Sequence, residues 1–246
     1  MSQAALLERD RELATLEPVV DEAASGEGRV VVFEGPAGIG KTRLLGETRR
    51  LAEAAGMRVL SARGGALERE YPYGVVRQLF EPVLVDPEAR ERLLGESAAL
   101  ARPVFEGADA GAPDSGEFST LHGLYWLTVN LATERPLMLA LDDLQWCDRP
   151  SLRFVAYLNR RIEGMGLLVA ATRRDAEPGT DPALLAEITG DPSATSLRPQ
   201  PLSPTAGREL VSAGLGREPD ERFTAACQKA TGGNPLLLGQ LVSALR

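Results

Sequence analysis

The clearest chemical motif in the sequence is a glycine-rich segment that ends in a lysine and a threonine. Residues 35–42 read Gly-Pro-Ala-Gly-Ile-Gly-Lys-Thr and satisfy the pattern G-x-x-x-x-G-K-[ST]. The glycines let backbone N–H groups close around a phosphate, Lys41 can reach its outer oxygens, and the Thr42 hydroxyl can bind Mg²⁺. A merely structural glycine turn is the alternative interpretation. The predicted nucleotide-binding residues of this segment are Gly35, Pro36, Ala37, Gly38, Ile39, Gly40, Lys41, Thr42 and Arg43.

Two carboxylates follow an apolar run over residues 137–141, whose length suits a buried strand. Ligands of an open parallel sheet lie at the carboxyl ends of its strands. Mg²⁺ held by nucleotide phosphates needs an acidic group there, so Asp142 is the predicted metal-side carboxylate, acting through water and together with Thr42. Asp143 is placed to polarise an attacking water. The alternative is that Asp143 simply caps the following loop.

A cationic pair follows the next apolar run, in the string Ala-Ala-Thr-Arg-Arg of residues 170–174. Arg173 could recognise the charge of a γ-phosphate through paired N–H bonds. It could equally be a surface arginine that pairs with Asp175, and the sequence leaves both interpretations open. Lys41, Asp143 and Arg173 are therefore the predicted catalytic residues.

These side chains require strands that end at one edge of a sheet. Helical patterns over residues 40–55 and 151–162 separate short apolar or β-branched runs, as expected of parallel strands covered on both faces. The pattern predicts an α/β phosphate-loop fold with a parallel sheet of about five strands flanked by helices. The predicted strands cover residues 29–33, 58–62, 137–141, 167–171 and 195–198.

The rest of the chain is predicted to be mainly helical. Residues 73–132 show a helical pattern interrupted by a Gly/Ala/Asp/Pro/Ser loop over 107–116, and residues 175–193 read as loop with a short helix at 184–188. We predict a nucleotide-binding core over residues 1–202 and a small helical lid over residues 203–246. The lid helices are predicted over residues 205–214, 218–231 and 235–246.

Charge and composition limit the classes of partner. The formal net charge is −8, and no basic stripe is apparent, so we expect no direct nucleic-acid binding by this segment. No apolar run approaches the length of a membrane span, and the N-terminus lacks a signal-peptide pattern. Cys147 and Cys227 indicate neither a disulfide framework nor a zinc site. A cytoplasmic protein is the expectation.

Four segments together resemble signal-transduction ATPases with numerous domains. They are the phosphate loop, residues 141–151 (LDDLQWCDRPS), residues 171–174 (ATRR) and residues 232–237 (GGNPLL). The sequence is most similar to the ATPase domain of the large ATP-binding LuxR-type transcriptional regulators. This resemblance covers nearly the whole chain. It implies an AAA-like nucleotide switch with slow ATP turnover coupled to assembly.

The resemblance also assigns roles to single residues. It implies that Arg9, in the segment Leu-Glu-Arg-Asp-Arg-Glu-Leu of residues 7–13, lies near the adenine, although Glu8 replaces the family's usual glycine. A solvated helix start is the alternative for Arg9. Pro235 resembles the lid proline that packs on the nucleotide, with a helix-initiating proline as the alternative. Gln145 stands where many relatives have histidine, which puts any imidazole role there in doubt.

The sequence therefore predicts an ATP/ADP-binding regulatory ATPase with Mg²⁺ as cofactor. Two alternatives remain, a module that holds ADP without appreciable turnover and a phosphotransferase with an unknown acceptor. The resemblance implies a sensor region and a DNA-binding helix-turn-helix beyond this chain, so the sequence is expected to be an excised domain. Self-association, or contact with those missing regions, is the expected partnership.

Overall fold

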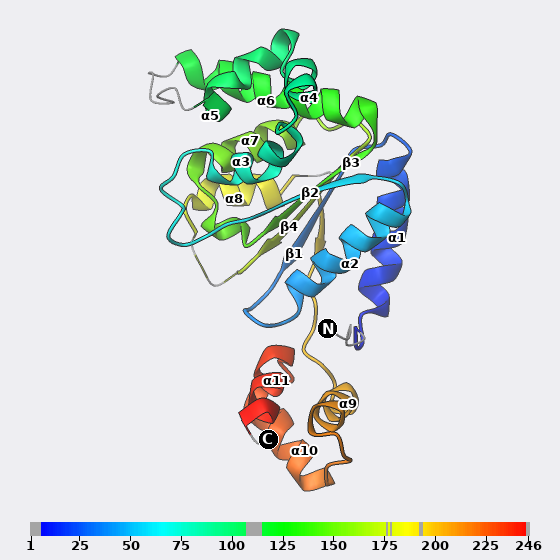
Figure 1. The fold of residues 1–246 in the computed structure, drawn as a ribbon. Coiled ribbons are helices and arrows are strands. Elements are labelled where there is room, and N and C mark those ends of the chain that lie inside the picture. Colours follow the sequence, from blue (N-terminus) through cyan, green and yellow to red (C-terminus); the bar gives the residue numbers. More distant parts are fainter. Residues whose placement is uncertain (1–5, 107–114, 176, 178, 192–193, 245–246) are drawn as a thin grey trace.

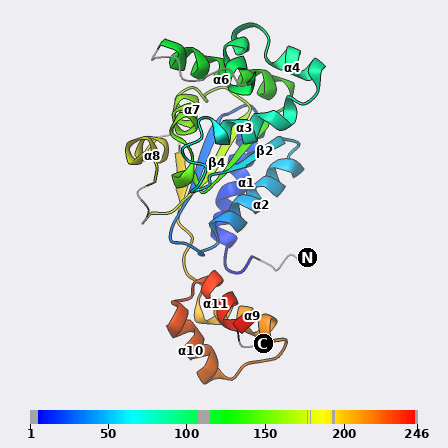
Figure 2. The ribbon, with the colours of Figure 1, turned by 60° about the vertical axis from the view of Figure 1, so that its left-hand side comes forward.

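Figures 1 and 2 show the computed structural model of the chain, which describes residues 6–106, 115–175, 177, 179–191 and 194–244. Within these residues five strands form one sheet in the order β2-β3-β4-β1-β5, and every neighbouring pair is parallel. The predicted α/β class with a parallel sheet is confirmed. The strands are β1 (Arg29–Glu34), β2 (Arg58–Arg63), β3 (Leu137–Asp142), β4 (Leu167–Arg173) and β5 (Ala194–Leu197).

Helices cover both faces of this sheet, and a separate helical group lies beyond its C-terminal edge (Figures 1 and 2). On one face lie α1 (Asp10–Ala24) and α2 (Lys41–Ala54), and on the other lie α3 (Gly74–Phe80), α7 (Arg149–Asn159) and α8 (Pro182–Thr189). The remaining helices are α4 (Pro87–Leu93), α5 (Arg102–Glu106), α6 (Ser115–Glu134), α9 (Pro204–Leu215), α10 (Glu221–Thr231) and α11 (Pro235–Ala244), with 3₁₀ turns η1 (Glu81–Val83), η2 (Glu96–Ala101) and η3 (Leu144–Trp146).

The central strands are buried because their residues are almost all apolar and are covered from both sides. Successive side chains of a strand point to opposite faces. Val31 and Phe33 of β1 therefore join the hydrophobic cluster formed with α1 and α2. Val30 and Val32 join the larger cluster on the other face. This burial on both faces holds the strands in place, so that the polar residues at their C-terminal ends lie along one edge of the sheet.

Helix boundaries follow from capping residues that the periodicity alone did not place. The helix expected over 151–162 is α7, Arg149–Asn159, because Asp148 caps it by accepting a hydrogen bond from Ser151 N at 2.9 Å. The helix expected over 218–231 begins at Glu221, because Asp220 accepts from Phe223 N at 2.8 Å. In both cases an aspartate fixes the first turn.

The region between β2 and β3 is helical, as predicted. Helices α3 to α6 and the turns η1 and η2 pack over the larger hydrophobic cluster. The loop expected over 107–116 falls almost wholly outside the described residues, and its last two positions belong to α6, which begins at Ser115.

The C-terminal helices α9, α10 and α11 form the group at the bottom of Figure 1. Their buried side chains make a hydrophobic cluster of their own that includes Val211, Cys227 and Leu238. Leu202, on the core side of the predicted boundary, belongs to the same cluster, and Leu7 packs against it. We call residues 203–244 the lid. The boundary at residue 202 itself stays a prediction.

Both cysteines are buried and unpaired as thiols. Burial raises the pKa of the Cys147 thiol far above its ordinary value, so it behaves as a small apolar side chain. Across the described part of the chain, no helix combines the length and apolarity needed to cross a membrane.

Candidate functional site

The glycine-rich loop joins β1 to α2 at the C-terminal edge of the sheet. Gly38 and Gly40 have φ values of +79° and +107°, in the left-handed region that favours glycine. The first N–H groups of a helix have no acceptor within it, so the start of α2 favours an anion. A cavity of about 730 Å³ adjoins this start. Its lining includes Ala37, Gly38, Gly40, Lys41, Thr42, Arg43, Arg63, Asp143, Arg174 and Pro235.

Lys41 lies folded back onto the loop that precedes it. Its Nζ donates to the backbone oxygens of Gly35 and Pro36, both at 2.8 Å. Burial lowers the pKa of Lys41, and the nearby positive charge of Arg174 lowers it further. An anion at the cavity would relieve that repulsion. The ammonium group is thus held where phosphate oxygens could replace two carbonyls.

Thr42 and Asp142 lie together, as the predicted metal site requires. Thr42 Oγ1 donates to Asp142 Oδ1 at 3.0 Å, and Thr172 Oγ1 donates to the same oxygen at 2.7 Å. A hydroxyl and a carboxylate from neighbouring elements are hard oxygen ligands of the kind Mg²⁺ prefers. The two predicted ligands therefore fit the ion, and the Thr172 hydroxyl orients the carboxylate.

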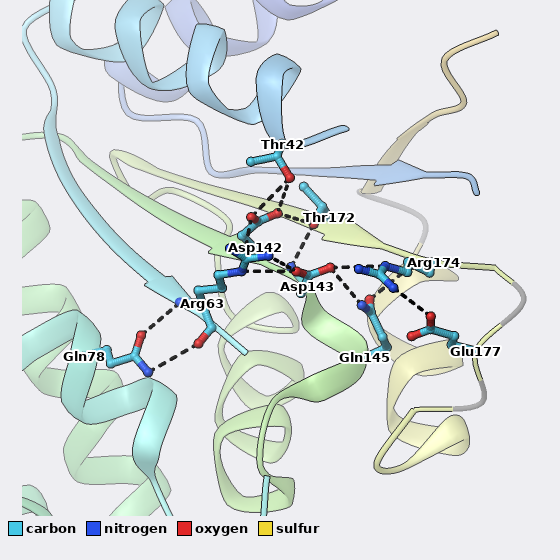
Figure 3. Close-up of polar contacts among 9 residues, drawn as sticks. All are labelled: Thr42, Arg63, Gln78, Asp142, Asp143, Gln145, Thr172, Arg174 and Glu177. Carbon is cyan, nitrogen blue, oxygen red and sulfur yellow. Dashed lines mark hydrogen bonds and ion pairs between the residues drawn. The ribbon is translucent and has the colours of Figure 1, made fainter. Parts of the chain in front are cut away.

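Asp143 occupies a more crowded position, shown in Figure 3. Its backbone adopts φ +56°, in the left-handed region that non-glycine residues seldom occupy. Arg63 Nη2 donates to Oδ2 at 2.8 Å, Gln145 Nε2 donates to Oδ1 at 3.0 Å, and Arg174 Nε lies 3.5 Å from Oδ1. The side chain makes no capping bond to η3, so the simple loop-cap alternative does not describe it. Both carboxylate oxygens are engaged by donors.

Three further hydrogen bonds fix the residues around Asp143. Gln78 of α3 accepts from Arg63 N at 3.0 Å and donates to Arg63 O at 3.3 Å, which holds the end of β2. Gln145 Oε1 accepts from Arg174 N at 3.1 Å. Gln145 therefore links Asp143 to Arg174, because its side-chain amide offers both a donor and an acceptor.

Arg173, the last residue of β4, and Arg174, which follows it, take different positions because successive side chains along a strand point to opposite faces. Arg173 Nη1 lies 3.6 Å from Glu34 Oε1 and donates to Thr189 Oγ1 at 3.1 Å. Its ion-pair partner in the described residues is Glu34, in place of the Asp175 considered from sequence. Arg174, not Arg173, lines the cavity beside the phosphate loop. The predicted sensor Arg173 is therefore not among the residues that line this cavity, whereas its neighbour Arg174 is.

Arg9 is buried, which removes the solvated interpretation. Its Nη2 donates to Ile39 O at 3.1 Å and to Gln200 O at 2.8 Å. Glu8, at the place of the glycine in the resembled family, keeps a glycine-like φ of +54°. Its carboxylate accepts from Ser203 N at 2.8 Å and from the Ser203 hydroxyl, and these bonds lower the pKa of Glu8.

A second, mainly apolar cavity of about 320 Å³ lies where the N-terminal segment, the phosphate loop and the lid meet. Pro235 lines both cavities and also begins α11. Gly40, Arg43, Leu210 and Pro235 line both, which makes the cavities neighbours. The smaller one is further lined by Leu6, Leu7, Arg9, Ile39, Leu202, Glu209 and Ala213.

Residues 5–170 match the family model of the AAA ATPase domain. The chain belongs to this family. A curated relative, an uncharacterised protein of Rhizobium meliloti (strain 1021), is 26% identical over 269 aligned residues. The alignment takes in 96% of this chain but 24% of the relative, so the chain spans about a quarter of that protein's length.

Solved structures share the fold of this AAA domain. A signal-transduction ATPase with a tetratricopeptide repeat sensor from Pyrococcus horikoshii is similar with a TM-score of 0.53 and 18% identity, over 97% of this chain and 30% of that one. The ORC2 protein of Aeropyrum pernix, solved with ADPNP and ADP, is similar with a TM-score of 0.53 and 18% identity, over 97% of this chain and 68% of that one. AMPPCP-bound DnaA of Aquifex aeolicus is similar with a TM-score of 0.52 and 14% identity, over 96% of this chain and 61% of that one.

Sequence reasoning missed three residues of this site. Arg63 was overlooked because an arginine at the end of an edge strand carries no motif, although the parallel order places the end of β2 beside that of β3. Arg174 was passed over for its neighbour, since the sequence does not show which of two adjacent arginines points to the loop. Thr172, in the string already noted, orients Asp142 through its hydroxyl.

Proposed function

We propose that this AAA domain binds ATP and ADP with Mg²⁺ and acts as a regulatory switch. The observation that carries the proposal is the phosphate loop. Its lysine is folded against it, its glycines hold left-handed backbone, and the Thr42–Asp142 pair lies beside it. In this assignment Lys41 binds the outer phosphates. Thr42 and Asp142 hold the ion, which would neutralise phosphate charge when bound.

The second cavity supports a base-binding role on the other side of the loop. Its lining is mainly apolar. It adjoins the larger cavity beside the phosphate loop, with which it shares lining residues. A flat aromatic base suits such a pocket, while the phosphates suit the arginine-lined one. Arg9 and Pro235 would then contact the nucleoside, as their resemblance to family residues suggests. The complexes of the ORC2 protein and DnaA with adenine nucleotides support this assignment by analogy of fold.

The finer proposal is that the chain is the switch domain of a LuxR-type transcriptional regulator, with slow hydrolysis coupled to conformational change or assembly. The four sequence segments support it, as does a curated relative about four times as long as the matched region. Sensor and DNA-binding functions would belong to other regions of such a protein. A cytoplasmic location follows from the same assignment.

One observation favours a second candidate, a module that holds ADP without appreciable turnover. The Asp143 carboxylate is engaged by Arg63, Gln145 and Arg174, so it is not available to accept a proton from water in this conformation. Turnover requires these donors to release it. A phosphotransferase has no such observation in its favour.

Calorimetry with ADP, ATP and GTP, each with and without Mg²⁺, tests the proposal on the 246-residue chain. We expect adenine nucleotides to bind and Lys41→Ala to weaken them by about 100-fold, because charge-assisted bonds to phosphate are lost. Lys229→Ala is the matched control, since Lys229 is the other lysine of the sequence and lies exposed on α10. Unchanged ADP and ATP affinity in Lys41→Ala would refute the proposed site.

A phosphate-release assay with the same proteins then separates the two candidates. Release that is slow, depends on Mg²⁺ and is absent from Lys41→Ala supports the switch that hydrolyses ATP. Tight ADP binding without release supports the holding module. Chromatography after denaturation identifies any nucleotide retained through purification, and so shows independently whether the protein keeps ATP or ADP.

A further inference from the structure

The backbone carbonyls of residues 35–39 in the phosphate loop accept hydrogen bonds from Lys41 of the loop itself and from donors outside it. Lys41 Nζ donates to the carbonyl oxygens of Gly35 and Pro36. The next carbonyls accept from the lid and from the N-terminal segment. Ala37 O accepts from Asn234 Nδ2 at 2.8 Å, Gly38 O from Leu236 N at 3.3 Å, and Ile39 O from Arg9 Nη2 at 3.1 Å.

Asn234 has two separate tasks at this contact. Its Oδ1 accepts from Leu236 N at 3.1 Å and Leu237 N at 3.3 Å, so it caps the first turn of α11. Its Nδ2 is thereby free to point to Ala37 O. One side chain thus joins the start of a lid helix to the backbone of the loop.

The lid and the loop are also in close contact at Gly38. A Cβ placed on Gly38 would lie 2.6 Å from Leu236 Cβ and 2.7 Å from Asn234 Oδ1. Such distances leave no room for a side chain. The loop therefore cannot move toward the lid without displacing the first turn of α11.

Peptide planarity converts this contact into control of the phosphate-binding amides. The C=O of one residue and the N–H of the next belong to one rigid plane and point in opposite directions. The donor that holds Ala37 O therefore sets the direction of the Gly38 N–H. By the same argument, Leu236 N sets the direction of the Ile39 N–H. These are loop amides of the kind that bind phosphate.

We infer that Asn234 is a positioning residue that orients the Gly38 amide for phosphate and couples phosphate binding to the lid. The inference rests on the proposed nucleotide binding and adds the route by which the loop and α11 affect each other. Because coupling is reciprocal, phosphate that fixes the Gly38 peptide also strengthens the hold on Asn234 and on α11. Loss of the Asn234 amide should weaken both effects together.

Two substitutions separate the bridge from the helix cap. Asn234→Asp and Asn234→Ser both retain an oxygen that can cap α11, and both remove the Nδ2 amide group that donates to Ala37 O. The aspartate adds a negative charge near the phosphate site and the serine does not. Asp220→Asn is the control, because it exchanges acid and amide at the cap of α10, where the side chain bonds Phe223 N.

The measurements are ADP affinity by calorimetry and hydrogen exchange over α11, without ligand and with saturating ADP. We expect both Asn234 variants to lose about tenfold in affinity, the range of one hydrogen bond. Their α11 should keep wild-type exchange without ligand and lose the extra protection that ADP gives the wild type. Asp220→Asn should behave as wild type in affinity and in the ADP-induced change.

Contrary outcomes are distinct. Reduced protection of α11 without ligand, with affinity unchanged, would show that Asn234 only caps the helix and would overturn the inference. Weaker binding by Asn234→Asp with normal binding by Asn234→Ser would assign the effect to charge and overturn it as well. If wild-type protein bound no adenine nucleotide, the proposed function would fail first, and the inference with it.

Discussion

Arg63 and Asp143 form a two-donor ion pair in which Arg63 Nη2 and Nε reach the same carboxylate oxygen, at 2.8 and 3.2 Å. Arg63 ends the edge strand β2 and Asp143 follows the neighbouring strand β3. Arg174 approaches the other oxygen of the carboxylate. The pair therefore places the predicted catalytic carboxylate between two cations that also line the phosphate cavity.

The first prediction concerns Asp143 itself. Asp143→Asn should slow ATP hydrolysis by about 100-fold, because general-base assistance is lost, while nucleotide affinity stays close to that of the parent. Single-turnover hydrolysis and calorimetry on the same preparation measure the two effects. Hydrolysis at the parent rate would show that this carboxylate has a structural role.

The second prediction concerns the ion. Asp142→Asn should raise the Mg²⁺ concentration needed for half-maximal ATP binding by about tenfold, as expected when a supporting carboxylate is replaced by a neutral amide. A Mg²⁺ titration of ATP affinity measures it, and Thr172→Val is the companion variant because its hydroxyl orients Asp142. An Mg²⁺ dependence equal to that of the parent in Asp142→Asn would exclude Asp142 from the metal site.

The third prediction separates the adjacent arginines at the end of β4. Arg174→Gln should weaken ATP binding by about tenfold, because Arg174 lines the phosphate cavity and a charged donor is lost. Arg173→Gln should leave ATP affinity near the parent value and lower the melting temperature, because it leaves Glu34 with one less cation. The reverse pattern would restore Arg173 as the γ-phosphate sensor.

The fourth prediction concerns nucleic acid. With a formal net charge of −8, the 246-residue chain should not shift promoter DNA at physiological salt. A gel-shift titration over salt concentrations measures this, with a basic DNA-binding domain as the positive control. A salt-sensitive shift at micromolar protein would contradict the assignment of DNA binding to other regions.

The strands and the main site were predictable because their signals are local. Apolar runs mark β1, β3 and β4, and the glycine pattern before α2 determines both the loop and the position of Thr42. Near-continuous apolar runs of this kind are typical of central parallel strands, which are buried on both faces. The pairing of Thr42 with Asp142 follows from that topology, since the carboxyl ends of parallel strands lie at one edge.

The remaining contacts depend on orientation, which a sequence pattern does not specify. Whether Arg173 or Arg174 faces the loop depends on where β4 ends. Asp143 adopts a left-handed backbone, in which few non-glycine residues lie, and the sequence pattern does not specify this conformation. The bridge between Asn234 and Ala37 joins residues 197 positions apart, so only the folded lid brings them together.

The position of Lys41 has a practical consequence for chemistry on the intact protein. The sequence contains two lysines, Lys41 and Lys229, one at the phosphate loop and one exposed on α10. The lowered pKa of Lys41 leaves it more uncharged amine than an ordinary lysine at the same pH, and a bound phosphate would both cover it and restore its charge. If nucleotide fills the proposed site, mild acylation followed by mass spectrometry should give a ratio of modified Lys41 to modified Lys229 that falls as nucleotide is added. The two lysines would then report occupancy of the proposed site without a label or an engineered residue.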